Sequence, residues 1–185
     1  MKTQEIECRF LEIDKDKLIQ RLLELGATDK GEVLLEEIII YDPAEEWRKD
    51  NKFIRLRKAG DMVTVAYKEY KSQSVDGAYE IEFKVDDYEK AVLFFEKIGF
   101  KPFRYQQKRR HSFMLDNIIF DIDTWPNIPS YLEIEAESKQ DLQKATQVIG
   151  YDWAEAVFNN AKWILENKYN IPLRDLRYFT FDRVE

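Results

Sequence analysis

Charged side chains alternate with apolar ones along several short segments of the chain, and acids and bases are grouped separately. Three segments carry the pattern Glu-x-Glu, at Glu5-Ile6-Glu7, Glu80-Ile81-Glu82 and Glu133-Ile134-Glu135. Bases follow the same spacing in Arg55-Leu56-Arg57 and in Lys108-Arg109-Arg110. Because side chains along a strand point to opposite faces with a period of two residues, each charged set shares one face and the apolar residues share the other.

These groups match the chemistry of hard metal ions and phosphates. Carboxylates without histidine or cysteine nearby suit Mg²⁺ or Mn²⁺, and clustered arginines and lysines suit phosphate oxygens. A site for a metal-chelated polyphosphate would need both groups in one cavity. The structural alternative is a solvated face, or bases and acids that pair with each other. The bases are Arg9, Arg55, Arg57, Lys68, Lys84, Lys108 and Arg110, and the acids are Glu5, Glu7, Glu80, Glu82, Asp121, Asp123, Glu133 and Glu135.

The composition excludes several other kinds of site. The chain has 185 residues, with 29 Lys and Arg against 36 Asp and Glu, so its formal net charge is −7. Its one cysteine, Cys8, and its one histidine, His111, leave no disulfide framework, zinc cluster or histidine triad. The acidic balance argues against a nucleic-acid-binding protein. No apolar run approaches the roughly 18 residues of a membrane span, and the charged N-terminal residues do not match a signal peptide, so we expect a soluble cytoplasmic protein.

A weak internal repeat positions the three Glu-x-Glu segments. Each is followed by a capping Asp or Ser, an amphipathic run and a glycine, which predicts a strand and then a helix. Further strands are expected at about 34–41, 53–58, 62–70, 105–114 and 117–123. A last helix is expected to start near Asp152 and to run to about Tyr169, followed by an aromatic tail packed on the surface.

About eight strands and four helices, mostly joined as neighbours, predict an α+β fold with an antiparallel sheet. The amphipathic helices are available to cover the apolar faces of the strands, which would leave the charged faces inside. A closed or nearly closed sheet would also remove unpaired edges. We therefore expect a barrel that is apolar outside, under the helices, and charged inside.

The same residues resemble a known family, the CYTH superfamily of triphosphate tunnel metalloenzymes. That superfamily includes class IV adenylyl cyclases, thiamine triphosphatases and inorganic tripolyphosphatases, and the chain looks most similar to the class IV cyclase-like and thiamine triphosphatase branch. Its opening Glu5-Ile6-Glu7-Cys8-Arg9 is similar to a Glu-x-Glu-x-Lys signature. The similarity continues in order to about residue 150, through Tyr41-Asp42, Phe53-Ile54-Arg55-Leu56-Arg57, Thr64-Val65-Ala66-Tyr67-Lys68, Glu80-Ile81-Glu82, Lys108-Arg109-Arg110, Ile122-Asp123 and Leu132-Glu133-Ile134-Glu135.

The resemblance implies an eight-stranded antiparallel β-barrel, a tunnel with a charged interior and amphipathic helices packed outside. It implies one domain over residues 1–185, with signature strands at about 4–137 and a C-terminal helix and tail, 152–185, packed on it. The implied partner is a small-molecule triphosphate rather than nucleic acid or a membrane, and the implied assembly is a monomer or a homodimer.

The resemblance also implies roles for individual residues. The triphosphate would be held by Arg9, Arg55, Arg57, Lys68, Lys108 and Arg110. One or two Mg²⁺ or Mn²⁺ ions would be held by Glu5, Glu7, Asp123, Glu133 and Glu135. The residues assigned to catalysis are Glu5, Glu7, Lys68, Glu80 and Glu82.

Departures from the family pattern bear on the substrate. The signature lysine is Arg9, so a planar fork replaces a compact ammonium. The usual glycine-containing turn before the last Glu-x-Glu is replaced by 125–130, where Trp125 is a candidate for stacking on an organic ring. Three functions stay open: metal-dependent hydrolysis of inorganic tripolyphosphate or of a nucleoside or thiamine triphosphate, which we favour; cyclisation of ATP to cyclic AMP and pyrophosphate; and polyphosphate binding without catalysis.

Overall fold

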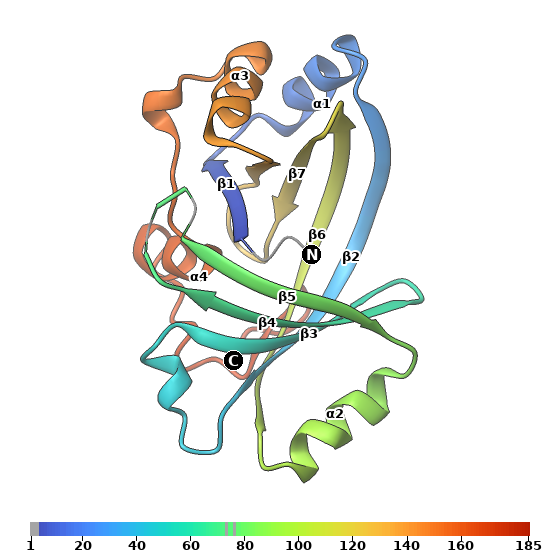
Figure 1. The fold of residues 1–185 in the computed structure, drawn as a ribbon, viewed down its shortest axis with the longest axis vertical. Coiled ribbons are helices and arrows are strands. Elements are labelled where there is room, and N and C mark those ends of the chain that lie inside the picture. Colours follow the sequence, from blue (N-terminus) through green and yellow to red (C-terminus); the bar gives the residue numbers. More distant parts are fainter. Residues whose placement is uncertain (1–3, 73, 76) are drawn as a thin grey trace.

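The described residues form a closed antiparallel β-barrel with helices outside (Figure 1). The computed structural model describes residues 4–72, 74–75 and 77–185. The barrel strands pair in the order β2-β3-β4-β5-β1-β8-β7-β6, and pairing of β6 with β2 closes the sheet. Their bounds are β1 (Gln4–Phe10), β2 (Thr28–Tyr41), β3 (Lys52–Ala59), β4 (Met62–Tyr70), β5 (Ala78–Val85), β6 (Lys101–Leu115), β7 (Ile118–Thr124) and β8 (Tyr131–Ala136). The expected eight-stranded barrel is therefore confirmed.

Two of these strands are longer than their apolar patterns predict. β2 begins at Thr28 rather than near residue 34, and β6 starts at Lys101 rather than near residue 105. Their register runs from Thr28 opposite Met114 to Tyr41 opposite Lys101. The first residues of β2 are exposed, so backbone pairing rather than side-chain burial keeps them in the strand.

Three helices begin where the capping residues predict. They are α1 (Lys15–Glu24), α2 (Tyr88–Lys97) and α3 (Lys139–Ile149). The side chains of Asp14, Asp87 and Ser138 accept hydrogen bonds from backbone N–H groups in the first turns of these helices. Gly150, at the end of α3, has a φ of 88°, a left-handed conformation that glycine adopts without steric cost. None of the helices in the described part of the chain is long and apolar enough to cross a membrane.

Apolar clusters cover the outer faces of the strands. α3 packs on β1, β7 and β8 and also contacts α1, and the cluster there includes the fully buried Cys8, Phe113 and Ile134. α2 packs on a second cluster around Ile38 and Leu56. Because these apolar side chains face outward under the helices, the charged side chains that alternate with them face the interior of the barrel.

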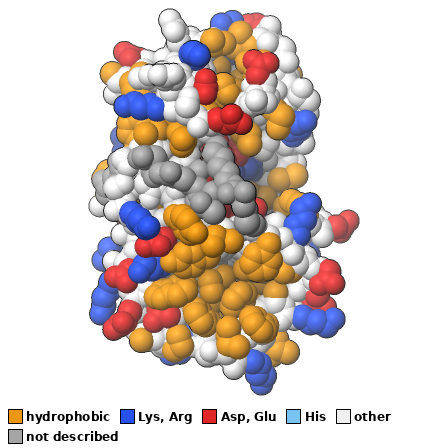
Figure 2. Space-filling model, viewed as in Figure 1, with side chains coloured by type: hydrophobic (Ala, Val, Ile, Leu, Met, Phe, Trp, Pro, Cys, Tyr) orange, Lys and Arg blue, Asp and Glu red, His pale blue; other side chains and the backbone are white. Residues whose placement is uncertain are grey.

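The surface near α2 is markedly apolar. Phe94 of α2 is 59% exposed, Ile98 directly after this helix is 52% exposed, and Phe83 of β5 is 53% exposed. Figure 2 shows apolar side chains gathered over the lower half of this face, where Figure 1 places β5 and α2. α2 therefore covers its part of the barrel less completely than α1 and α3 cover theirs.

The expected helix from about 152 to 169 is wrong in its first half. Asp152 caps only a 3₁₀ turn, Trp153–Glu155. The backbone of Val157 then exchanges two hydrogen bonds of 2.9 Å with that of Arg9, which holds the chain extended. Helix α4 (Ala161–Trp163) starts after Asn160, whose side chain accepts from the Trp163 N–H, and continues as a π-helical turn to residue 168.

The remaining tail lies against the barrel. Its short strand β9 (Tyr178–Phe179) runs parallel to β6, and Leu165, Leu173 and Phe179 are buried in one cluster with Trp125. The expected domain span also includes residues 1–3, which lie outside the described residues.

Candidate active site

The inward charged side chains surround one cavity inside the barrel, with a volume of about 350 Å³. We call it the polar cavity. Its charged lining comes from strands β1, β3, β4, β5, β6 and β8. The lining side chains include Glu5, Arg9, Arg55, Arg57, Lys68, Tyr70, Glu80, Glu82, Lys108, Arg110, Glu133 and Glu135. The barrel therefore brings most of the predicted phosphate-binding and metal-binding residues to one place.

The strand register sets opposite charges directly across from each other. Arg9 on β1 is opposite Glu133 on β8, and Lys68 on β4 is opposite Glu80 on β5. The Arg9 guanidinium lies 2.6 Å from a Glu133 oxygen, and Lys68 Nζ lies 2.6 Å from Glu80 Oε2. Lys68 Nζ also lies 3.0 Å from Glu5 Oε2. Without a ligand, the acids and bases of the polar cavity therefore neutralise each other.

A second group of ion pairs lies at β6, β7 and β8. Asp123 is fully buried and accepts from Lys108 Nζ at 2.6 Å and from Arg110 Nε at 2.7 Å. Arg110 also contacts Asp121 at 2.5 Å and Glu133 at 2.9 Å. Arg110 thus holds three carboxylates together, and both Asp123 oxygens are occupied by protein cations.

Glu37, which the sequence analysis did not single out as a site residue, anchors the β2 side of the tunnel. It is 4% exposed, and its Oε1 lies 2.7 Å from Arg57, the residue opposite it on β3. Its Oε2 accepts from Gln106 Nε2 at 2.6 Å, and Gln106 Oε1 accepts from Arg104 Nε at 2.9 Å. Burial opposes ionisation of Glu37, but Arg57, Arg55 and Lys108 outweigh it and hold the pKa of this carboxyl well below its usual range. The available signal was a single acid that alternates with the apolar residues Leu35, Ile39 and Tyr41 on the inward face of β2.

Glu5 shows the opposite behaviour. Burial, together with a smaller effect of the neighbouring acids Glu80 and Glu7, raises the pKa of its carboxyl to about 8 against the attraction of Lys68. A buried carboxyl among other carboxyls needs either a proton or a cation. Glu5 is therefore the carboxylate of the polar cavity whose surroundings most favour an added cation.

The expected metal ligands do not form a ready-made cage. Among the described residues, no three Asp, Glu, His or Cys side chains are grouped closely enough to hold a metal ion by themselves. Instead, Glu7 and Glu133 share Arg9, and Asp123 is taken up by Lys108 and Arg110. Mg²⁺ is commonly held by one or two carboxylates together with waters and substrate phosphate oxygens. The donor set fits an ion of that kind, with Glu5 as the nearest candidate ligand.

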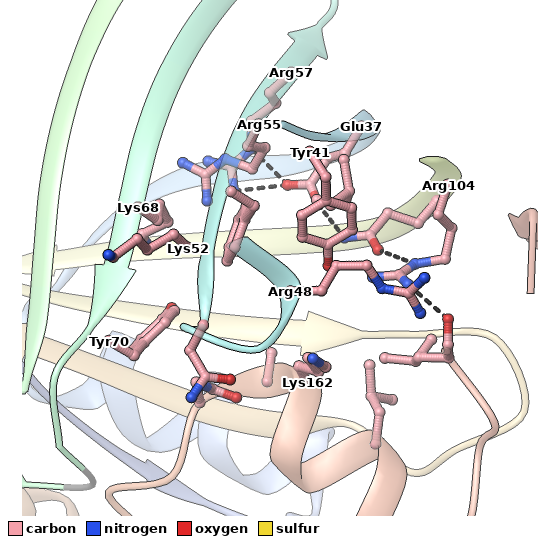
Figure 3. A pocket seen from close by; sticks show the side chains of 18 of the residues that line it. Glu37, Tyr41, Arg48, Lys52, Arg55, Arg57, Lys68, Tyr70, Arg104 and Lys162 are labelled. Atoms are coloured by element: carbon pink, nitrogen blue, oxygen red, sulfur yellow. Dashed lines mark hydrogen bonds and ion pairs between the residues drawn. The ribbon is translucent and has the colours of Figure 1, made fainter. Parts of the chain in front are cut away.

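A second cavity of about 80 Å³ adjoins the polar cavity, and we call it the distal cavity (Figure 3). The two share Arg55, Arg57, Lys68, Tyr70 and Lys108 in their linings. Burial raises the pKa of Tyr70 to about 12, so it stays a neutral phenol. The distal cavity also has lining residues that the sequence analysis missed, on the turn after β2, on β6 and on α4, namely Arg48, Arg104 and Lys162.

Other expected positions are also located. Trp125 lines the distal cavity as a buried side chain whose Nε1 donates to the Tyr131 hydroxyl at 3.0 Å. His111 Nε2 lies 2.8 Å from Asp29 Oδ1, and His111 does not line the polar or the distal cavity. Lys84, expected among the inward bases, is exposed.

Replacing Glu37 by Gln should destabilise the protein by about 3 kcal/mol at pH 7, because Arg57 loses its buried counter-charge. Glu37 has a folded pKa below the unfolded value near 4.5, so its stabilisation is present above that pH and is lost as the pH falls further. The stability difference from the wild type should therefore shrink below pH 4.5, which urea unfolding at several pH values measures. The matched control is Glu36→Gln, at the exposed residue next to Glu37. An equal loss of stability in both variants would contradict the role of Glu37 as the buried counter-charge of Arg57.

Comparisons with known proteins agree with this geometry. Residues 3–151 match the model of the CYTH domain. A protein of Methanocaldococcus jannaschii named "putative adenylate cyclase" is 27% identical over 146 residues, which cover 78% of this chain and 83% of that protein.

Solved structures share the fold. A Pyrococcus horikoshii protein aligns with a TM-score of 0.71 at 24% identity, covering 84% of this chain and 96% of that one. A "putative adenylate cyclase" of Vibrio parahaemolyticus aligns with a TM-score of 0.75 at 13% identity, covering 90% and 99%. A Hippeastrum "putative adenylyl cyclase", described as having a dominant triphosphatase activity, aligns with a TM-score of 0.62 at 13% identity, covering 93% and 99%. Because the family model matches most of the chain in one continuous stretch, this protein belongs to the CYTH family.

Proposed function

We propose that this protein is a divalent-metal-dependent triphosphatase that hydrolyses a triphosphate bound in the polar cavity. One observation carries the proposal: arginines and lysines from four strands and carboxylates from three strands line the same cavity. The bases suit the phosphate oxygens and the acids suit Mg²⁺ or Mn²⁺. Membership of the CYTH family supports both halves of this assignment.

The phosphate oxygens would replace carboxylate oxygens as partners of the bases. Arg55, for example, donates to Glu80 at 2.8 Å and to Glu82 at 3.0 Å in the ligand-free protein. A triphosphate would compete for this guanidinium and for the other bases, which are Arg9, Arg57, Lys68, Lys108 and Arg110. The strands hold these donors in fixed positions, so they can offset the charge that develops on the transferred phosphoryl group without reorganising.

The released carboxylates would then be free to bind metal. Glu5 and Glu7 on β1 are the first candidate ligands. Asp123 on β7 and Glu133 and Glu135 on β8 are further candidates. When bound, the divalent ion neutralises phosphate charge and orients a water for attack at phosphorus. Glu80 and Glu82 would act through the bases that they contact, by keeping Lys68 and Arg55 aimed into the cavity.

Hydrolysis is favoured over cyclisation because two acceptor side chains of the distal cavity, Glu37 and Gln106, already bind protein donors. A cyclase must recognise adenine, whose amino group requires an acceptor. Glu37 accepts from Arg57 and Gln106, and the Gln106 carbonyl accepts from Arg104. The triphosphatase activity described for the Hippeastrum protein also supports hydrolysis. Conversion of ATP to cyclic AMP is the second candidate, because relatives from Methanocaldococcus and Vibrio carry adenylate cyclase names.

Purified protein with Mg²⁺ or Mn²⁺ should release orthophosphate from tripolyphosphate or ATP and form no cyclic AMP. The assay resolves orthophosphate, pyrophosphate and cyclic AMP, with EDTA as the control that should abolish turnover. Cyclic AMP with stoichiometric pyrophosphate would replace hydrolysis by cyclisation. Binding of tripolyphosphate without any product would leave a polyphosphate-binding module.

Replacing Glu5 by Gln should lower the metal-dependent rate by about 100-fold or more while the fold is retained. The reason for retention is that the pKa of Glu5 is about 8, so an amide resembles the protonated carboxyl of the ligand-free protein near neutral pH. The measurements are the rate as a function of Mg²⁺ concentration and the thermal unfolding midpoint, with Glu24→Gln on the exposed face of α1 as the control. An unchanged Mg²⁺ dependence would remove Glu5 from the metal site. The size of the loss follows from the several kcal/mol that a metal ion contributes to charge stabilisation.

A further inference from the structure

The far end of the distal cavity is built by three cationic side chains from separate parts of the chain. Arg48 lies in the turn after β2, Arg104 on β6 and Lys162 on α4 (Figure 3). The distal and polar cavities share lining residues and therefore adjoin, so the three cations lie next to the site proposed for the triphosphate. Lys162 also lies beyond residues 3–151, so the family match does not specify it.

Arg104 is a buried cation without a carboxylate partner among the described residues. It is 4% exposed, and its Nε and NH1 donate to the Gln106 side chain at 2.9 Å and to the Leu173 carbonyl at 2.8 Å. Both acceptors are neutral. Burial of a charge without a directly paired opposite charge is costly. Burial lowers the pKa of Arg104, although the nearby carboxylates of Glu166 and Glu37 act in the opposite direction. The site therefore gains from an added anion.

Arg48 and Lys162 add to this positive charge. The Arg48 guanidinium carbon lies 4.1 Å from the centre of the Phe103 ring, and the Arg48 guanidinium forms an ion pair of 2.9 Å with Glu45. No described carboxylate lies within ion-pair distance of the Lys162 ammonium. Burial lowers the pKa of Lys162, Glu166 opposes that shift, and the nearby Arg174, Arg104 and Arg48 lower the pKa further.

Most of the charged side chains that line the cavity are cationic. The one carboxylate in its lining, Glu37, is already bound by Arg57 and Gln106. One water molecule needs a cavity of roughly 10–15 Å³. The volume of about 80 Å³ therefore holds several groups of that size. A tetrahedral phosphoryl group, which presents acceptors on all sides, matches both the size and the chemistry of this cavity.

We propose that Arg48, Arg104 and Lys162 form a second anion site, which binds a phosphoryl group attached to the substrate beyond the three in the polar cavity. This inference rests on the proposed function, because it needs a triphosphate in the polar cavity. The additional group belongs either to a longer inorganic chain or to the organic part of a triphosphate. In both cases the site selects substrates with a fourth phosphoryl group over the parent triphosphates.

Calorimetry in metal-free buffer tests this with two pairs of ligands. The inorganic pair is tripolyphosphate and linear tetrapolyphosphate, and the organic pair is ATP and its 3′-phosphorylated derivative. The ligand with four phosphoryl groups in at least one pair should bind about tenfold more tightly than its parent, which is the effect of one charge-assisted contact. The pair that shows the gain identifies the source of the additional group.

Variants at Lys162 make the test specific. Lys162→Met should reduce the tenfold gain to less than twofold and leave tripolyphosphate affinity unchanged, whereas Lys162→Arg should keep the gain. Lys49→Met, an exposed neighbour of Arg48, is the control that should change neither value. Thermal unfolding checks that each variant is folded, and Arg48→Met gives an independent second variant.

Three results would overturn the inference in different ways. If tripolyphosphate binds but neither ligand with a fourth phosphoryl group binds more tightly than its parent, the second anion site is wrong and the proposed function stands. If the wild type binds none of the four ligands, the second anion site is wrong, and the assay of orthophosphate release with Mg²⁺ or Mn²⁺ decides the proposed function separately. A gain that survives unchanged in Lys162→Met and in Arg48→Met also rejects the site.

Discussion

Charges buried inside a barrel must be neutralised, and this requirement organises the structure of the protein. Arginines and lysines of the polar cavity that would be unstable alone are each held by one or more carboxylates, as in the contact of Arg110 with Asp121, Asp123 and Glu133. Such pairs contribute little net stability compared with apolar packing, but breaking one is costly. The interior is therefore balanced only as a whole, and a ligand can enter only by exchanging partners with protein groups.

The helices and apolar clusters outside the barrel keep the charged side chains of the interior paired. Apolar clusters under α1, α2 and α3 hold the strands in register, and the register places Arg9 opposite Glu133 and Lys68 opposite Glu80. A slip of one residue would turn every charged side chain toward an apolar cluster. The C-terminal segment also positions a residue of the distal cavity. Its buried Leu165 and Leu173 pack α4 against the barrel, and this packing places Lys162 in the lining of the distal cavity.

Much of this arrangement could be predicted from the sequence. The period of two in the Glu-x-Glu and Arg-x-Arg segments indicates which side chains share a face, and Asp14, Asp87 and Ser138 mark the helix starts. The pairing partners could not be predicted, because register depends on contacts between distant strands. Arg104 was missed as a site residue for the same reason, whereas Glu37 was marked by its position among the apolar inward residues of β2. The break before α4 was missed because the backbone of Arg9, far away in sequence, binds Val157 and keeps this segment extended.

The central claim is that a metal ion and a triphosphate together replace the internal ion pairs, so that each ligand satisfies the charges that the other releases. Its most direct test is the free energy of unfolding with Mg²⁺ alone, with tripolyphosphate alone and with both at the same concentrations. The stabilisation by both ligands together should exceed the sum of the two separate effects. A joint stabilisation equal to that sum, or smaller, would contradict it.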